Sequence, residues 1–233
     1  MKKKMVMGLA IGLFLFGIEG FAGATTLTFD TLSTDPGGGI SVNNPFIEQG
    51  FLITPLAGSS LAAYGDGWQN NRGSSNGTTY VGLYMGGSWD GRLELRAFNN
   101  SLFSITSIDL GELLNQGDYY FDLIATNISF TGYKDGGTEI NDSFVMDMTS
   151  DGSGGNIDFQ THLFNSSWTG LTSITIKATN SDGGVSAGGP YVYFAFDNIV
   201  LNETATPVPE PATMLLIGSG LIGLAGLRRK FKK

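Results

Sequence analysis

The chain has 233 residues, a length that suits one domain with end segments or at most two small domains. It contains no cysteine and one histidine, which excludes disulfides, cysteine catalysis, a lipoprotein anchor on cysteine and poly-histidine metal sites. The 35 glycines follow no Gly-X-Y period, so the chain is not collagen-like, and an aromatic content of 12% favours a folded core over disorder.

The N-terminus has the three parts of a secretory signal peptide. Three lysines (residues 2–4) precede an apolar run over residues 5–18, and Ala22-Gly23-Ala24 supplies small residues for cleavage. Lysines stay on the cytoplasmic side, and the apolar run enters the Sec translocon but is too short for a stable span. We expect a signal helix over residues 1–24, cleaved after Ala24. The alternative is an uncleaved N-terminal anchor.

Residues 25–206 indicate an all-β body. Short runs of alternating apolar and polar residues, clearest at 92–97 and 173–179, are separated by turn residues. Asp135-Gly136-Gly137 predicts a tight hairpin turn, and 191–202, apolar on both faces, predicts a central strand. About nine or ten strands favour a β-sandwich of two antiparallel sheets. The predicted strands are 27–32, 50–54, 80–84, 92–97, 102–110, 119–127, 128–134, 138–148, 173–179 and 191–202.

Two tryptophans in glycine-rich loops are candidate sugar-stacking platforms. Trp68 lies in Gly-Asp-Gly-Trp-Gln-Asn-Asn-Arg and Trp89 in Gly-Gly-Ser-Trp-Asp-Gly, where a large aromatic is hard to explain as core. Trp168 precedes a predicted strand and is expected in the core. The acidic, glycine-rich stretch 151–158 matches no calcium-loop pattern and is expected to be a turn.

Enzymatic activity has little support in the sequence. His162 has no neighbouring serine or aspartate in a catalytic pattern, and no Gly-x-Ser-x-Gly motif occurs, so we expect an ordinary surface or loop histidine. No phosphate-binding glycine loop is present. A glycosidase needs only two well-placed carboxylates, so a secreted carbohydrate-active enzyme remains an alternative.

The C-terminus predicts a membrane segment. Residues 212–227 carry no charge, and sixteen helical residues span about 24 Å, slightly less than a hydrocarbon core of about 30 Å. Arg228, Arg229 and Lys230, followed by Phe231, Lys232 and Lys233, would stay in the cytoplasm as a stop-transfer signal. We therefore expect a transmembrane helix in the inner membrane, with the body on the far side.

The exported body is strongly acidic. Residues 25–206 hold five basic and nineteen acidic side chains, a net charge of −14. Such a domain repels nucleic acid and anionic membrane surfaces, so we expect no nucleic-acid partner. It attracts divalent cations weakly, although solubility alone also explains the charge.

The last 27 residues, 207–233, resemble the PEP-CTERM sorting signal. The resemblance rests on Val208, Pro209, Glu210 and Pro211, followed by the short apolar helix and the basic cluster. It implies a Gram-negative exporter and processing near Pro-Glu-Pro by an exosortase. It also implies delivery to the cell surface or extracellular matrix, with exopolysaccharide and biofilm formation. A plain tail anchor with a proline-rich stalk is the alternative.

The body is similar to jelly-roll β-sandwich ectodomains of PEP-CTERM proteins, which are distantly similar to carbohydrate-binding modules. The likeness rests on residues 27–30, 128–133, 171–174 and 196–199. It implies pairing of the first and last strands and a structural calcium on Asp30 and Asp197, with Asn198 as a further ligand. The alternative is that the two aspartates lie apart and bond to loops. We expect a non-enzymatic surface protein, or alternatively a glycan-binding module.

Overall fold

The computed structural model describes residues 23–32, 39–56, 58–65, 77–85, 91–112, 127–147, 149, 158–179, 194–203 and Ser219. Gly23–Thr204 forms one compact unit, and Met1–Ala22 with Ala205–Lys233 forms another. The expected signal peptide (1–24) and sorting segment (207–233) fall almost wholly outside the described residues, so these boundaries stay predictions. Among the described residues, no helix has the length and apolar character needed to cross a membrane.

The described part of the compact unit Gly23–Thr204 is built of strands, which confirms the all-β prediction. Every strand pair is antiparallel. The strands are β1 Ala24–Leu27, β2 Gly39–Ser41, β3 Phe46–Glu48, β4 Phe51–Leu56, β5 Ser59–Tyr64, β6 Tyr80–Met85, β7 Arg92–Ala97, β8 Phe103–Glu112, β9 Asn127–Lys134, β10 Glu139–Val145, β11 Phe159–Leu163, β12 Leu171–Thr179 and β13 Phe194–Glu203.

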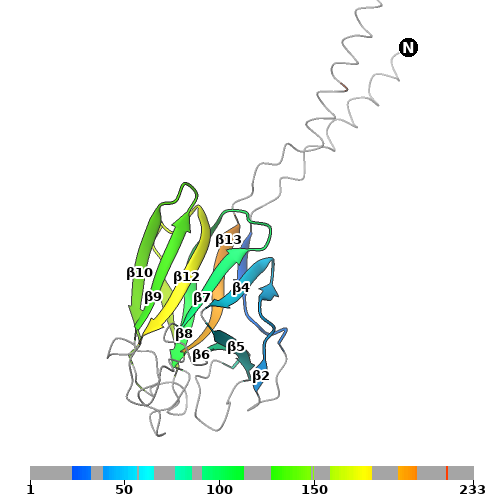
Figure 1. Ribbon diagram of the computed structural model, residues 1–233, viewed down its shortest axis with the longest axis vertical. Helices are drawn as coiled ribbons and strands as arrows, with labels where there is room; N and C mark the ends of the chain where they lie inside the picture. The colour runs from blue at the N-terminus through cyan, green and yellow to red at the C-terminus, as the bar shows by residue number, and fades with distance from the viewer. Residues whose placement is uncertain are drawn as a thin grey trace, which may run out of the picture. The chain divides into compact units, whose positions relative to one another are not determined.

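The strands fall into two groups. The first group runs β2-β5-β6-β13-β8, with β1 beside the second part of β13 and β11 beside β8. The second runs β3-β4-β7-β12-β9-β10. Figure 1 shows β10, β9, β12, β7 and β4 side by side, with β13 passing behind them. The predicted central position of 191–202 is confirmed by β13, which has paired neighbours on both sides.

The two groups are joined into one curled sheet instead of two separate ones. A single backbone pair, Leu171 with Phe103, connects β12 to β8. The junction forms because β8 is ten residues long and β11 covers only its later part, from Ser107 to Gly111. The uncovered beginning of β8 is free to bond elsewhere, and the Ile105 N–H donates to the Trp168 carbonyl at 3.2 Å.

The main hydrophobic core lies between the two groups. Phe51 of β4 and Phe103 of β8 meet edge to face with ring centroids 5.5 Å apart. Trp168 is 1% exposed, which confirms its predicted core position. The alternation predicted for 92–97 is also confirmed, since Leu93, Leu95 and Ala97 are buried. This continuous packing supplies the rigid frame that holds the polar side chains described below.

At two places a turn with positive φ values determines where a strand ends. The hairpin at Asp135-Gly136-Gly137 is confirmed, with φ values of 87° and 82° at the glycines, as a tight turn requires. The predicted strand 27–32 ends instead at Leu27. Phe29 has φ 56°, and the Leu32 N–H donates to the Phe29 carbonyl at 2.9 Å, so a turn replaces the extended chain.

Candidate functional site

Several predicted site residues lie outside the described part of the chain. These are the tryptophans Trp68 and Trp89, the sorting-motif residues Val208, Pro209, Glu210 and Pro211, and the basic residues Arg228, Arg229 and Lys230. Their roles stay predictions. The described residues do include the predicted calcium ligands and the single histidine.

The terminal strands of the body pair with one another, as the resemblance implies. β1 runs antiparallel to β13, with Ala24 opposite Asn202 and Leu27 opposite Ile199. Asp30 lies just after the paired part of β1, and Asp197 lies just before the paired part of β13. The rings of the adjacent residues Phe29 and Phe196 meet edge to face at 5.5 Å. The pairing therefore brings the two chain segments together.

Asp197 is fully buried, and its carboxylate is held by hydrogen bonds. Its Oδ2 accepts from the Thr78 hydroxyl at 2.8 Å, and its Oδ1 accepts from the Asn198 N–H at 2.8 Å. The Asn198 amide donates to Asp109 Oδ2 at 2.9 Å, and the Thr161 hydroxyl donates to Asp109 Oδ1 at 2.6 Å. These contacts tie β13 to β8, β11 and the segment before β6. Asp197 and Asn198 thus already serve a structural network.

A bulge in β13 positions this network. The register to β8 shifts between Asp197 and Val200, and Asn198 has φ 45°, in the left-handed region that asparagine tolerates. The shift turns the Asn198 side chain toward Asp109 of β8. Sequence patterning alone does not reveal the bulge, because 191–202 is apolar on both faces.

Glu48, which sequence reasoning missed, is the second buried carboxylate at this end of β1. It ends β3, is 7% exposed, and its Oε1 accepts from the Phe29 N–H at 3.1 Å. Its Oε2 is buried without a hydrogen-bond partner. Burial raises the pKa of Glu48 and Asp30 raises it further, while hydrogen bonds from the Phe29 and Thr28 backbone lower it. The one sequence feature that could have pointed to a buried carboxylate is the position of Glu48 within the apolar stretch Phe-Ile-Glu-Gln-Gly-Phe.

Asp30 has a different environment from Asp197. It is exposed on the turn that follows β1, and its charge acts on Glu48. The described residues contain no group of three or more His, Asp or Glu placed to hold a metal ion. The predicted set of Asp30, Asp197 and Asn198 stays a prediction.

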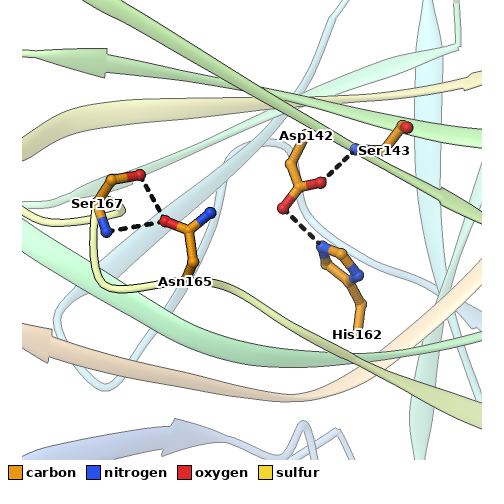
Figure 2. Close-up of polar contacts among 5 residues, drawn as sticks. All are labelled: Asp142, Ser143, His162, Asn165 and Ser167. Atoms are coloured by element: carbon orange, nitrogen blue, oxygen red, sulfur yellow. Dashed lines mark hydrogen bonds and ion pairs between the residues drawn. The ribbon is translucent and has the colours of Figure 1, made fainter.

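The single histidine is not an ordinary surface or loop residue. His162 lies in β11, where its side chain is 12% exposed, and its Nε2 is 3.3 Å from Asp142 Oδ2 (Figure 2). Its ring stacks on Phe130 with centroids 5.0 Å apart and meets the edge of Phe164 at 4.6 Å. Sequence spacing could not show this, because Asp142 comes from β10, twenty residues earlier.

The hydrogen bonds of Figure 2 do not form a nucleophilic triad. Ser143 contributes only its backbone N–H, which donates to Asp142 Oδ1 at 2.8 Å. The Ser167 hydroxyl donates to Asn165 Oδ1 at 2.6 Å. A serine nucleophile needs its hydroxyl on the histidine, a contact that the drawn residues do not make. His162 and Asp142 instead link the strands β11 and β10.

The chain carries a PEP-CTERM protein-sorting motif at residues 207–230, which confirms the resemblance drawn from Val208, Pro209, Glu210 and Pro211. The match spans the proline-rich stretch, the apolar segment and the start of the basic cluster. Among curated proteins, none matches the sequence.

Solved structures give only a distant likeness to the body. A DUF4465 family protein from Bacteroides caccae ATCC 43185 is 15% identical, with a TM-score of 0.45 over 78% of this chain and 100% of its own. CBM29_1, a family 29 carbohydrate-binding module from Piromyces equi, is 10% identical, with a TM-score of 0.41 over 81% of this chain and 96% of its own. Likeness at this level carries no argument about function.

Proposed function

We propose that this protein is an exported, non-enzymatic surface or extracellular-matrix protein that an exosortase processes at its C-terminus. The sorting motif at residues 207–230 is the observation that carries the proposal. In this proposal the Sec translocon exports a jelly-roll-like sandwich, the C-terminal helix holds it transiently in the inner membrane, and processing delivers it to the cell surface. There it accompanies exopolysaccharide in a biofilm.

The proposed sorting mechanism follows from the chemistry of the three parts. Prolines 207, 209 and 211 cannot continue a helix, and they hold the chain before the membrane extended, as a protease cleft requires. The uncharged residues 212–227 partition into the bilayer as a temporary anchor. The arginines and lysines after residue 227 resist crossing, so the body stays outside and the basic end stays inside.

The processing step is testable in the native host. We expect Pro209→Ala/Glu210→Ala/Pro211→Ala to accumulate as full-length chain in the membrane fraction, because the extended processing segment is lost. Wild type should be recovered from the cell surface with a shorter C-terminal mass, read by mass spectrometry of the intact protein. Thr206→Ala, just before the motif, is the matched control. Wild type recovered at full length would contradict the proposal.

Glycan binding by the body is the alternative function, and it rests on Trp68 and Trp89. The loop with Trp68 joins β5 to β6, and the loop with Trp89 joins β6 to β7. The loops therefore start from opposite ends of a six-residue strand, roughly 17 Å apart. Each tryptophan must consequently be tested alone, not as one platform.

A pull-down with the host's own exopolysaccharide separates the two functions. If the body is a glycan-binding module, Trp68→Ala or Trp89→Ala should lower retention by up to about tenfold, since one aromatic stacking contact contributes on the order of 0.5–1.5 kcal/mol. Trp68→Phe should retain part of the binding. Equal retention of wild type and both alanine variants would rule out the tryptophan-based module and leave the proposed structural role.

A further inference from the structure

The first strand of the body contains the peptide bond at which we expect the signal peptide to be cleaved. This bond joins Ala24 to Thr25, and β1 runs from Ala24 to Leu27. Ala24 lies opposite Asn202 of β13, and Thr25 lies opposite Leu201. In the folded body the expected cleavage site is therefore part of an antiparallel ladder.

The chain just after this bond is held in the core. Leu27 and Phe29 are both 0% exposed. The Phe29 ring meets Phe196 of β13 edge to face, with centroids 5.5 Å apart, and the Phe29 N–H donates to Glu48 Oε1 at 3.1 Å. Withdrawing β1 from β13 beyond Thr26 consequently also withdraws Leu27 from the core. Fraying of the first residue of β1 does not free the bond and the residues that follow it.

A protease needs the same backbone groups that β13 occupies. Clefts that recognise an extended peptide bind its backbone as an added strand, and β1 is already paired along one of its edges. A folded protein is cut through a state in which the segment has opened, so the rate follows the population of that state. Removing a buried leucine from the core should lower this population by at least about thirtyfold.

We propose that the pairing of β1 with β13 closes the signal-cleavage site, so that efficient removal of the signal peptide must precede this pairing. The step is a hydrolysis: water adds across the bond and leaves a carboxylate on Ala24 and an ammonium group on Thr25. Among the described strands, β1 pairs only with β13, so the bond is accessible until residues 194–203 join the sheet. The inference rests on the proposed export and adds the order of two of its steps.

The test uses the full-length chain in mild detergent and a purified bacterial signal peptidase. In one arm the peptidase is present while the chain refolds after dilution from urea. In the other arm it is added after refolding is complete. Intact mass measures the loss of residues 1–24. We expect the refolded chain to be cleaved at least about thirtyfold more slowly than the initial rate of the refolding chain.

Two leucine variants separate local opening of β1 from global unfolding. Leu27→Ala and Leu93→Ala each remove a buried side chain, but only Leu27 lies in β1. After refolding, Leu27→Ala should be cleaved at least about tenfold faster than Leu93→Ala, with urea unfolding used to confirm that both variants are folded.

Refolded wild type that is cleaved as fast as the refolding chain would overturn the proposal, and so would equal cleavage rates for the two folded variants. A chain that is cleaved in neither arm would contradict the expected signal peptide, and with it the export on which the proposal rests.

Discussion

Glu48 shows how one side chain can set the response of the fold to solution conditions. The pKa of the Glu48 carboxyl lies above the ordinary value of 4.5, mainly because of burial. The folded state then holds the proton more tightly than the unfolded chain. Below pH 4.5 both states are protonated and burial costs little. As the pH rises through the folded pKa, the charged form accumulates and the penalty appears.

We therefore expect the free energy of unfolding of the protein to contain a Glu48 contribution that falls as the pH rises above 4.5. Urea unfolding of wild type and Glu48→Gln at several pH values measures it as the difference between the two curves. Relative to Glu48→Gln, wild type should lose stability toward neutral pH. A difference that stays constant, or that grows in favour of wild type, would contradict this account.

Residue-scale features were the hardest to predict from sequence. Trp168 was placed correctly because a large aromatic next to a clear strand has few positions other than the core. Glu48 was missed, since an acid in an apolar run shows neither its depth nor the backbone N–H that holds it. His162 gained a partner from a strand that is distant in sequence, and spacing carries no information on such contacts.

At the scale of elements, the contact of His162 with Asp142 connects two edge strands. β10 pairs only with β9, and β11 pairs only with β8, among the described strands. His162 fills the gap between them, packed on Phe130 and Phe164. A second link comes from Asp147, whose N–H donates to Gln160 Oε1 at 3.3 Å. Contacts that involve side chains, and not a backbone ladder, thus join β10 and the residues just after it to β11.

For His162, packing against the aromatic rings should contribute more to stability than the ion pair with Asp142. We expect His162→Ala to lower the free energy of unfolding by about 2–4 kcal/mol, because it leaves a cavity between aromatic rings. Asp142→Asn should cost about 1 kcal/mol or less, since the pair is partly exposed. Urea denaturation at pH 7 measures both. An Asp142→Asn loss equal to that of His162→Ala would show that charge dominates.

Elements with strong periodicity were predictable, and short ones were not. Strand 92–97 was predicted with its exact ends, because apolar and charged residues alternate without interruption. β2, β3, β5 and β11 were missed. Three to five residues are too few for a pattern in β2, β3 and β11, and the six residues of β5, Ser-Ser-Leu-Ala-Ala-Tyr, do not alternate between apolar and polar. The turn after β1 was also hidden, since Phe29 does not favour a left-handed conformation.

At the scale of the whole molecule, acidity is the dominant property. The net charge of −14 over residues 25–206 makes the folded body repel itself, because compaction brings like charges closer. Two like charges 10 Å apart repel by about 0.4 kcal/mol in water, and salt screens this within a similar distance. The net charge could be predicted from composition alone, because a count of charged residues does not depend on which residues are in contact.

Screening should therefore stabilise the protein. We expect 0.5 M sodium chloride to raise the free energy of unfolding of chelator-treated protein by on the order of 1 kcal/mol relative to 20 mM. Thermal unfolding in choline chloride at the same ionic strength provides the control for specific sodium binding. Stability that is unchanged or lower in both salts would contradict a role for self-repulsion.

The place of β13 in the sheet has a consequence for the order of events during secretion. Among the described strands this one is synthesised last, yet β8, β6 and β1 all pair with it. Before residues 194–203 emerge, β1 has no companion among the described strands and the gap between β6 and β8 stays open. In a chain threaded through a translocon, closure of the fold must then wait for the end of transit.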